Sequence, residues 1–293
     1  MSDQAFLKKL KILPPSFLWV LITLYVLLIP NAIIVYRYIE GKFGLVFAGK
    51  IPFVIIILFG LAFIAYLRLS RIKWKNVLYL IPCAVIVTVI LNLEDNPNKH
   101  IHIPEYVLLA WLLYAAMSRD YRGKGLFILI FLCASLLGVV DELEQGIHPG
   151  RSYGWSDMLV NSSSALIGVF SILGLTRRAK PSGWDWLRDL KAYSGLLIVI
   201  ATGLTGVVLM CVNLFHVQSA GGVFHGVYPP WLLAWSFFYM ISTPLFVYTH
   251  RSVIAALHPV MITTKMWTYP ILAILYYMHF LMVFVAITGV MFK

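Results

Sequence analysis

Nine apolar runs occupy most of the chain and constrain its fold more than any other feature. About 20 apolar residues in a helix cross the hydrocarbon core of a bilayer, and that helix satisfies its own backbone polar groups. Hydrophobic residues make up 61% of the 293 positions and charged residues only 12%, against about 25% in soluble domains. We therefore predict an all-α, polytopic bundle of about nine transmembrane helices. The expected spans are residues 16–36, 51–69, 76–93, 103–118, 126–143, 157–175, 192–213, 230–249 and 268–290.

Two features of these runs predict local departures from a straight transmembrane helix. The run at 103–118 is the shortest, so we expect it to be tilted or partly interfacial. Pro30 and Pro244 lie inside apolar runs, where a proline removes a backbone donor and kinks the helix.

The basic residues predict the orientation of the chain. With the N-terminus in the cytoplasm, 17 of the 23 lysines and arginines lie on the inner side, as the positive-inside rule requires. We therefore expect a multi-pass protein of the cell (inner) membrane with its C-terminus outside. The net charge of +11 is spread over short connections and forms no basic face, so membrane lipids are the expected partners and nucleic acid is not.

The acidic residues follow a different pattern. Seven of the twelve lie in or beside two predicted outer turns, although acidic residues contribute little to topology. They are Glu94, Asp95, Glu105, Asp141, Glu142, Glu144 and Asp157. This cluster requires an explanation other than orientation.

Three predicted helix ends carry the polar residues of this outer face. A spacing of four residues puts His102 with Tyr106, and Asp141 with Gln145, on shared helix faces. The Gly-Ile-His-Pro-Gly stretch at 146–150 predicts a tight turn that returns Arg151 towards the acidic helix end. The candidate catalytic residues are His102, Asp141, Glu142 and Asp157, and the candidate substrate-binding residues are Arg151, Gln145, Tyr106 and Asn161.

Ionisable groups at the ends of membrane helices are costly unless they pair or line a wet cavity, which favours a functional site. One alternative is a salt-bridge network, Arg151 with Asp157 or Asp141, that only holds three helices together. A second is that the carboxylates hold a divalent cation. We assign no residue to a metal and expect no other cofactor.

The motifs occur in a familiar order. K-x-x-H-x-x-x-Y (99–106) is followed by D-E-x-x-Q (141–145), P-G-R (149–151) and D-x-x-x-N (157–161). Over residues 76–175 the chain resembles the VanZ-like family of bacterial membrane proteins. It departs from the family at Glu144, where a histidine is usual and for which His148 or His100 could substitute, and at Ser164, near which a glycine is common. Gly168 keeps a small residue suited to close helix packing.

The resemblance implies a cell-envelope function. The family is associated with glycopeptide (teicoplanin) antibiotic resistance and has been proposed to process or exchange lipid head groups. It implies a division into N-terminal helices (1–75), a VanZ-like module (76–175) and C-terminal helices of unassigned role (176–293). In such chemistry Arg151 would bind a phosphate, and His102 would act as general acid or base. Asp141 would orient that histidine or serve as nucleophile.

Two classes of function stand beside each other at this point. One is an enzyme acting on phosphate-containing lipid head groups or envelope precursors at the outer leaflet. The other is a non-catalytic membrane protein that binds lipid or glycopeptide, or an accessory subunit of a larger membrane complex. A transporter is disfavoured because the charge stops at one face. His279, near the middle of the last span, is expected to be a packing residue with its hydrogen bonds satisfied.

Overall fold

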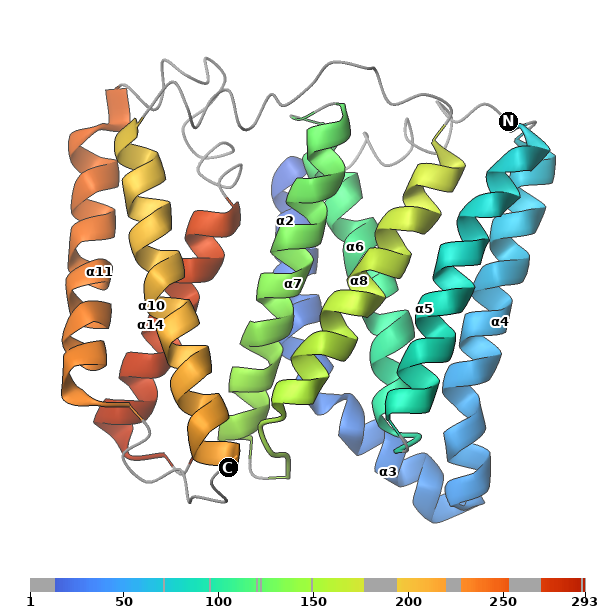
Figure 1. Cartoon of the computed structure of the whole chain (residues 1–293), viewed down its shortest axis with the longest axis horizontal. Helices are drawn as coiled ribbons and strands as arrows, with labels where there is room; N and C mark the ends of the chain where they lie inside the picture. The colour runs from blue at the N-terminus through green and yellow to red at the C-terminus, as the bar shows by residue number, and fades with distance from the viewer. Residues whose placement is uncertain are drawn as a thin grey trace. The chain divides into compact units, whose positions relative to one another are not determined.

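The computed structural model is built from helices, and no residue that it describes lies in a strand (Figure 1). It describes residues 14–70, 72–94, 96–119, 121, 123–148, 150–176, 194–219, 228–252, 270–290 and 292. With 3-10 helices labelled η, the elements are α2 (Pro15–Leu28), η1 (Ile29–Asn31), α3 (Ala32–Phe43), α4 (Leu45–Leu69), η2 (Trp74–Tyr79), α5 (Leu80–Leu93), η3 (Lys99–Ile101), α6 (His102–Met117), α7 (Lys124–Ile147), α8 (Trp155–Leu175), α10 (Ser194–Ser219), α11 (Pro230–Thr249) and α14 (Pro270–Thr288).

Each of the nine predicted spans overlaps at least one of these α-helices. Eight helical segments of the described chain are long and apolar enough to cross a membrane. The ninth, α6, has 16 residues and is therefore only about 24 Å long. The prediction of an all-α, multi-pass membrane protein is confirmed.

Pro30 interrupts the first span. It lies in η1, where the α-helix tightens into a 3-10 turn between α2 and α3. Figure 1 shows α3 running at an angle to α2 beyond this turn. The kink expected at Pro30 is confirmed. The α-helix α11 continues through Pro244, and the kink expected there stays a prediction.

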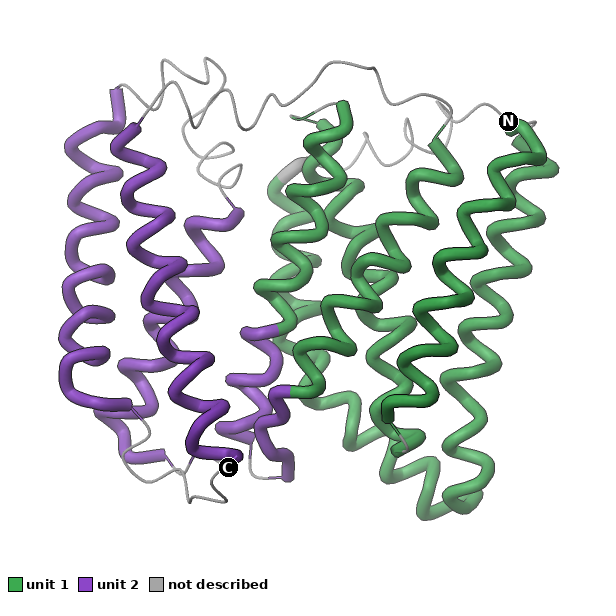
Figure 2. Tube along the Cα trace, in the orientation of Figure 1, with its two compact units in different colours: residues 1–138, 156–184 green, residues 139–155, 185–293 purple. Residues whose placement is uncertain are grey.

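The contacts divide the chain into two compact units (Figure 2). Unit 1 comprises residues 1–138 and 156–184, and unit 2 comprises residues 139–155 and 185–293. The division falls within α7, so the last turns of this helix belong with the C-terminal helices. The module boundaries at 75 and 175 follow the sequence motifs rather than these contacts, and they stay a prediction.

In unit 1, α6 is enclosed by its neighbours despite its short length. Ten of its 16 residues are buried, and it packs against α2 and α4. A β-carbon on Gly168 of α8 would lie 2.6 Å from the β-carbon of Ala110 on α6, well inside contact distance. The close packing expected at Gly168 is therefore present, with α6 as its partner.

In unit 2, His279 of α14 joins three helices. Its Nε2 lies 3.0 Å from the carbonyl oxygen of Gly203 on α10, and its Nδ1 lies 2.9 Å from the hydroxyl of Ser236 on α11. Because a carbonyl only accepts hydrogen bonds, Nε2 carries the proton. His279 is fully buried and is a satisfied packing residue, as expected.

Two glycines of α10 make room for this arrangement. A β-carbon on Gly203 would lie 2.5 Å from the hydroxyl oxygen of Tyr239, and one on Gly206 would lie 2.4 Å from Cε1 of His279. Without side chains, these positions let α10 approach α11 and α14 closely enough for the two rings to pack. Close approach at small residues is a common way for helices to associate in membranes.

We predict that Gly206→Ala destabilises the protein by about 1–3 kcal/mol, because the added methyl group overlaps the buried His279 ring. Gly60→Ala is the matched control, since Gly60 lies within α4 and nothing is within 4 Å of its β-carbon position. Alanine there should be neutral or stabilising by up to about 1 kcal/mol. Reversible denaturation in detergent micelles measures both changes, and equal destabilisation would contradict the packing argument.

Candidate functional site

The turn before α6 is held in shape by its own polar side chains. The backbone N–H of Asn96 donates to Glu94 Oε1 at 3.3 Å, and that of Asn98 donates to Asn96 Oδ1 at 3.0 Å. Nε2 of His100 lies 2.7 Å from the carbonyl oxygen of Glu94. Short-range bonds of this kind favour turns over continued helix. They place Lys99, the first residue of η3, beside the end of α5.

Lys99 forms ion pairs with two carboxylates of unit 1. Its ammonium lies 2.8 Å from Asp157 Oδ1 and 3.0 Å from Glu94 Oε2, and the Asp157 side chain is only 6% exposed. Burial disfavours the charge of Lys99, but the hydrogen bonds and charges of Asp157 and then Glu94 outweigh burial and raise the lysine pKa above 10.5. Lys99 therefore stays charged at physiological pH and compensates the buried aspartate.

This pairing bears on the alternative that a salt bridge only holds helices together. That alternative pairs Arg151 with Asp157 or Asp141, whereas the described ion partner of Asp157 is Lys99. Asp157 lies in the first turn of α8, where the helix dipole also favours a negative charge. A structural role of this kind suits Asp157 itself and leaves Arg151 for another role.

The start of α6 carries a buried histidine with a carboxylate beside it. Nδ1 of His102 lies 3.1 Å from Glu105 Oε2, and the His102 side chain is only 3% exposed. The ring of Tyr106 lies 6.3 Å from the His102 ring, so these residues share a helix face as predicted. Glu105 was not among the candidates, although the i,i+3 spacing pointed to it. Tyr25 of α2 fixes this turn by donating to the Glu105 carbonyl oxygen at 2.9 Å.

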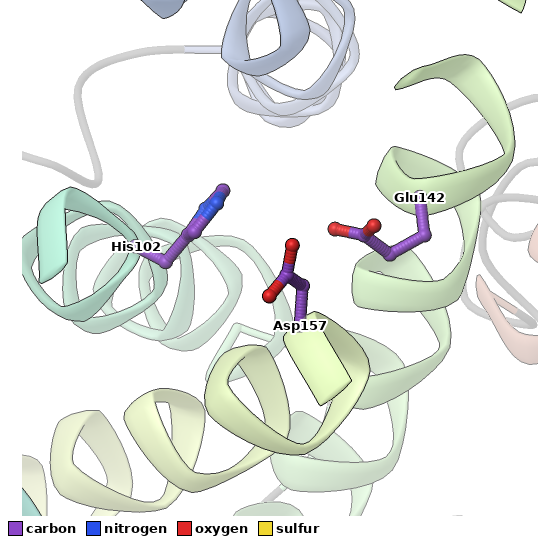
Figure 3. A group of neighbouring side chains, drawn as sticks. All are labelled: His102, Glu142 and Asp157. Atoms are coloured by element: carbon purple, nitrogen blue, oxygen red, sulfur yellow. The ribbon is translucent and has the colours of Figure 1, made fainter. Parts of the chain in front are cut away.

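The side chains of His102 and Asp157 point towards the same space in unit 1 (Figure 3). Each offers an atom of a type that binds metals, and these two atoms lie within 4.8 Å of one another. The ammonium of Lys99 is already at Asp157, however, and it would repel a divalent cation bound there. His102 and Asp157 by themselves therefore fit a divalent cation poorly. Glu142, also labelled in Figure 3, comes from α7 and belongs to unit 2.

Asn161 lies one turn deeper in α8 and is fully buried. Its side-chain amide is 3.5 Å from the carbonyl oxygen of Gly138 on α7. A β-carbon on Gly138 would lie 2.9 Å from that of Asn161 and 3.4 Å from the Tyr106 ring. The absence of a side chain at Gly138 thus lets Asn161 and Tyr106 pack closely against α7 in unit 1.

Three candidate residues of unit 2, Glu142, Gln145 and Arg151, form a second hydrogen-bonded set. Gln145 donates to Glu142 Oε1 at 3.1 Å, and the backbone N–H of Gly154 donates to Glu142 Oε2 at 3.0 Å. Arg151 donates to the side-chain oxygen of Gln145 through Nε, at 3.0 Å, and through Nη2. Asp141, Glu142 and Gln145 are almost completely buried in the last turns of α7.

The turn after α7 returns Arg151 to the helix end, as the sequence predicts. The backbone N–H of His148 donates to the carbonyl oxygens of Glu144 and Gln145, and that of Arg151 donates to His148 O. Nδ1 of His148 accepts a hydrogen bond from the Gly150 backbone at 3.2 Å. His148 and His100 thus both stabilise local turns through their rings. Pro149 of the P-G-R motif and Asp95 lie outside the described residues.

The C-terminal helices support this turn, a role that the sequence did not indicate. The hydroxyl of Tyr277 on α14 donates to Glu144 Oε1 at 2.7 Å, and Gln218 of α10 donates to the Tyr153 carbonyl oxygen at 3.0 Å. A β-carbon on Gly146 would lie 2.4 Å from the Phe292 ring. Each contact joins residues more than 60 positions apart, and the sequence has no periodic signal for such pairs.

No protein-family model, curated protein or solved structure matches this chain. The likeness to VanZ-like proteins rests on the quoted sequence motifs alone.

We predict that Tyr277→Phe destabilises the protein by about 1–3 kcal/mol, because it removes the hydroxyl that donates a hydrogen bond to the Glu144 carboxylate. Tyr276→Phe is the matched control, since the described chain shows no hydrogen bond from the Tyr276 hydroxyl. Denaturation in detergent micelles compares the two variants. An equal effect of both substitutions would show that the Tyr277–Glu144 bond contributes nothing.

Proposed function

We propose that the chain is a VanZ-like, multi-pass protein of the bacterial cell membrane that acts on phosphate-containing lipid head groups or envelope precursors at the non-cytoplasmic face. One observation supports this most. The Arg151 guanidinium binds the neutral amide oxygen of Gln145 and, within the described residues, forms no ion pair. Its positive charge is therefore available for an anionic ligand.

The geometry of Arg151 favours phosphate. Both of its hydrogen bonds use the Nε and Nη2 atoms, so the Nη1 end of the planar group is left for a ligand. A guanidinium binds phosphate oxygens through parallel hydrogen bonds, which a lysine does not reproduce. A lipid is the favoured source of that phosphate because Arg151 follows the end of a membrane-spanning helix.

His102 is the proposed proton carrier. In this proposal the imidazole of His102, whose Nδ1 lies 3.1 Å from Glu105 Oε2, exchanges a proton with substrate. In head-group exchange, His102 accepts the proton of the attacking hydroxyl as its oxygen bonds to phosphorus. It then returns that proton to the departing head-group alcohol as the old phosphorus–oxygen bond breaks. Glu105 orients the ring, and Asp141 is retained as a candidate nucleophile.

The other candidate residues have positioning roles in this proposal. Both carboxylate oxygens of Glu142 accept hydrogen bonds, from Gln145 and from Gly154, so Glu142 holds the turn that carries Arg151. Asp157 holds Lys99, and Asn161 and Tyr106 pack at Gly138. That the three helix ends serve one ligand is a prediction of the sequence, from the common outer side to which charge counting assigns them.

Labelled phospholipids in proteoliposomes test this proposal. We expect wild-type protein to exchange or release head groups, and His102→Asn to lower the rate by about 10²- to 10⁴-fold, the usual contribution of a general acid–base residue. Arg151→Ala and Arg151→Lys should both lower the rate, because lysine lacks the paired donors. Asp141→Asn tests whether Asp141 is the nucleophile, in which case turnover is lost, or only a structural carboxylate, in which case turnover remains.

Arg68→Ala is the control for loss of an arginine, since Arg68 lies in the last turn of α4, which charge counting assigns to the cytoplasmic side. It should leave turnover unchanged. Absence of turnover with every lipid tested, while Arg151→Ala abolishes lipid binding, would support the non-catalytic alternative. Unchanged binding and turnover in the Arg151 variants would contradict the proposal.

A further inference from the structure

Unit 1 contains a cavity of about 540 Å³ at the opposite end of α7 from the acidic residues. It lies among η2, the first turns of α7 and the last turns of α8. Its polar edge is formed by Asn76, Lys124 and Thr176, and its apolar wall includes Phe127, Phe131 and Leu173. Ligand cavities in proteins have volumes of about 300–1,000 Å³, so this one is large enough for part of a lipid.

Among the described residues that line this cavity, Lys124 is the only charged one. Its side chain is exposed and forms no ion pair with the described residues. Lys124 is also the first residue of α7, a helix of 24 residues, whose N-terminal dipole favours an anion. The amide of Asn76 and the hydroxyl of Thr176 donate to backbone carbonyls instead. An anionic group would therefore bind at Lys124.

The remaining lining favours a lipid over a soluble anion. The helices that form the apolar wall, α7 and α8, are both candidate membrane spans, and the wall extends from Lys124 along their sides. The basic residues predict that this end of α7 faces the cytoplasm. Basic pockets between helices on that side are typical sites for anionic lipid head groups.

We propose that this cavity binds one anionic phospholipid of the cytoplasmic leaflet, with its phosphate on Lys124 and an acyl chain along Phe127, Phe131 and Leu173. The proposal is independent of the function proposed for the outer face, because the two share no residue.

Native mass spectrometry of the full-length protein tests this, with phosphatidylglycerol and phosphatidylcholine of identical acyl chains added in detergent. Wild-type protein should prefer phosphatidylglycerol. Lys124→Gln should weaken its binding about fivefold, the contribution of one lysine near an anionic lipid, and leave phosphatidylcholine binding unchanged. Lys42→Gln is the control, since it removes a lysine from the last turn of α3 in the same unit. It should preserve the preference.

Ile128→Trp tests the apolar wall. Ile128 lines the cavity and is 42% exposed, so a larger side chain there should fill the cavity without disturbing the core. Binding of both lipids should fall. Equal binding of the two lipids by wild-type protein, or an unchanged preference in Lys124→Gln, would overturn the proposal. So would displacement of phosphatidylglycerol by millimolar inorganic phosphate, which would identify the ligand as a free anion.

Discussion

Lys99 lies between Asp157 and Glu94 at the ends of two membrane-spanning helices, and the polar part of unit 1 is organised around it. A carboxylate removed from water needs a compensating charge or hydrogen bonds, because its burial otherwise costs several kcal/mol. The turn that ends at Lys99 supplies that charge. Hydrogen bonds from its backbone to the side chains of Glu94 and Asn96 hold the turn in shape. The same turn leads into α6, so the compensation of Asp157 and the position of His102 depend on one local structure.

Arg151 differs from Lys99 in an informative way. Both are basic residues close to buried acidic groups, but Lys99 is bound to two carboxylates and Arg151 to a neutral amide. A charge that is fully paired contributes to structure and has little left for a ligand. A positioned charge that is not neutralised is suited to an anion. This difference separates a structural cation from a proposed ligand-binding one.

Close helix contacts at small residues support both sets of polar groups. Gly138 and Gly168 bring α8 against α7 and α6 in unit 1, and Gly203 and Gly206 admit the rings of Tyr239 and His279 in unit 2. Lipid tails are as apolar as leucine side chains, so burial of apolar surface does little to hold helices together in a bilayer. Close packing and hydrogen bonds such as those of His279 have to supply that association.

The sequence alone determined that the chain is an all-α, multi-pass membrane protein, because a bilayer admits only helices for apolar runs of this length. It also predicted the tight turn that returns Arg151 and the shared face of His102 and Tyr106, since these depend on local spacing. Only the tertiary structure decided that Lys99 is the ion partner of Asp157 and that Tyr277 and Phe292 contact the end of α7. Contacts between distant segments depend on how the helices pack, and the periodicity of a single helix carries no information about its partner. The polar residues were therefore visible in the sequence. The packed structure was needed to distinguish residues that are paired within the protein, such as Lys99, from Arg151, which is proposed to bind an anionic ligand.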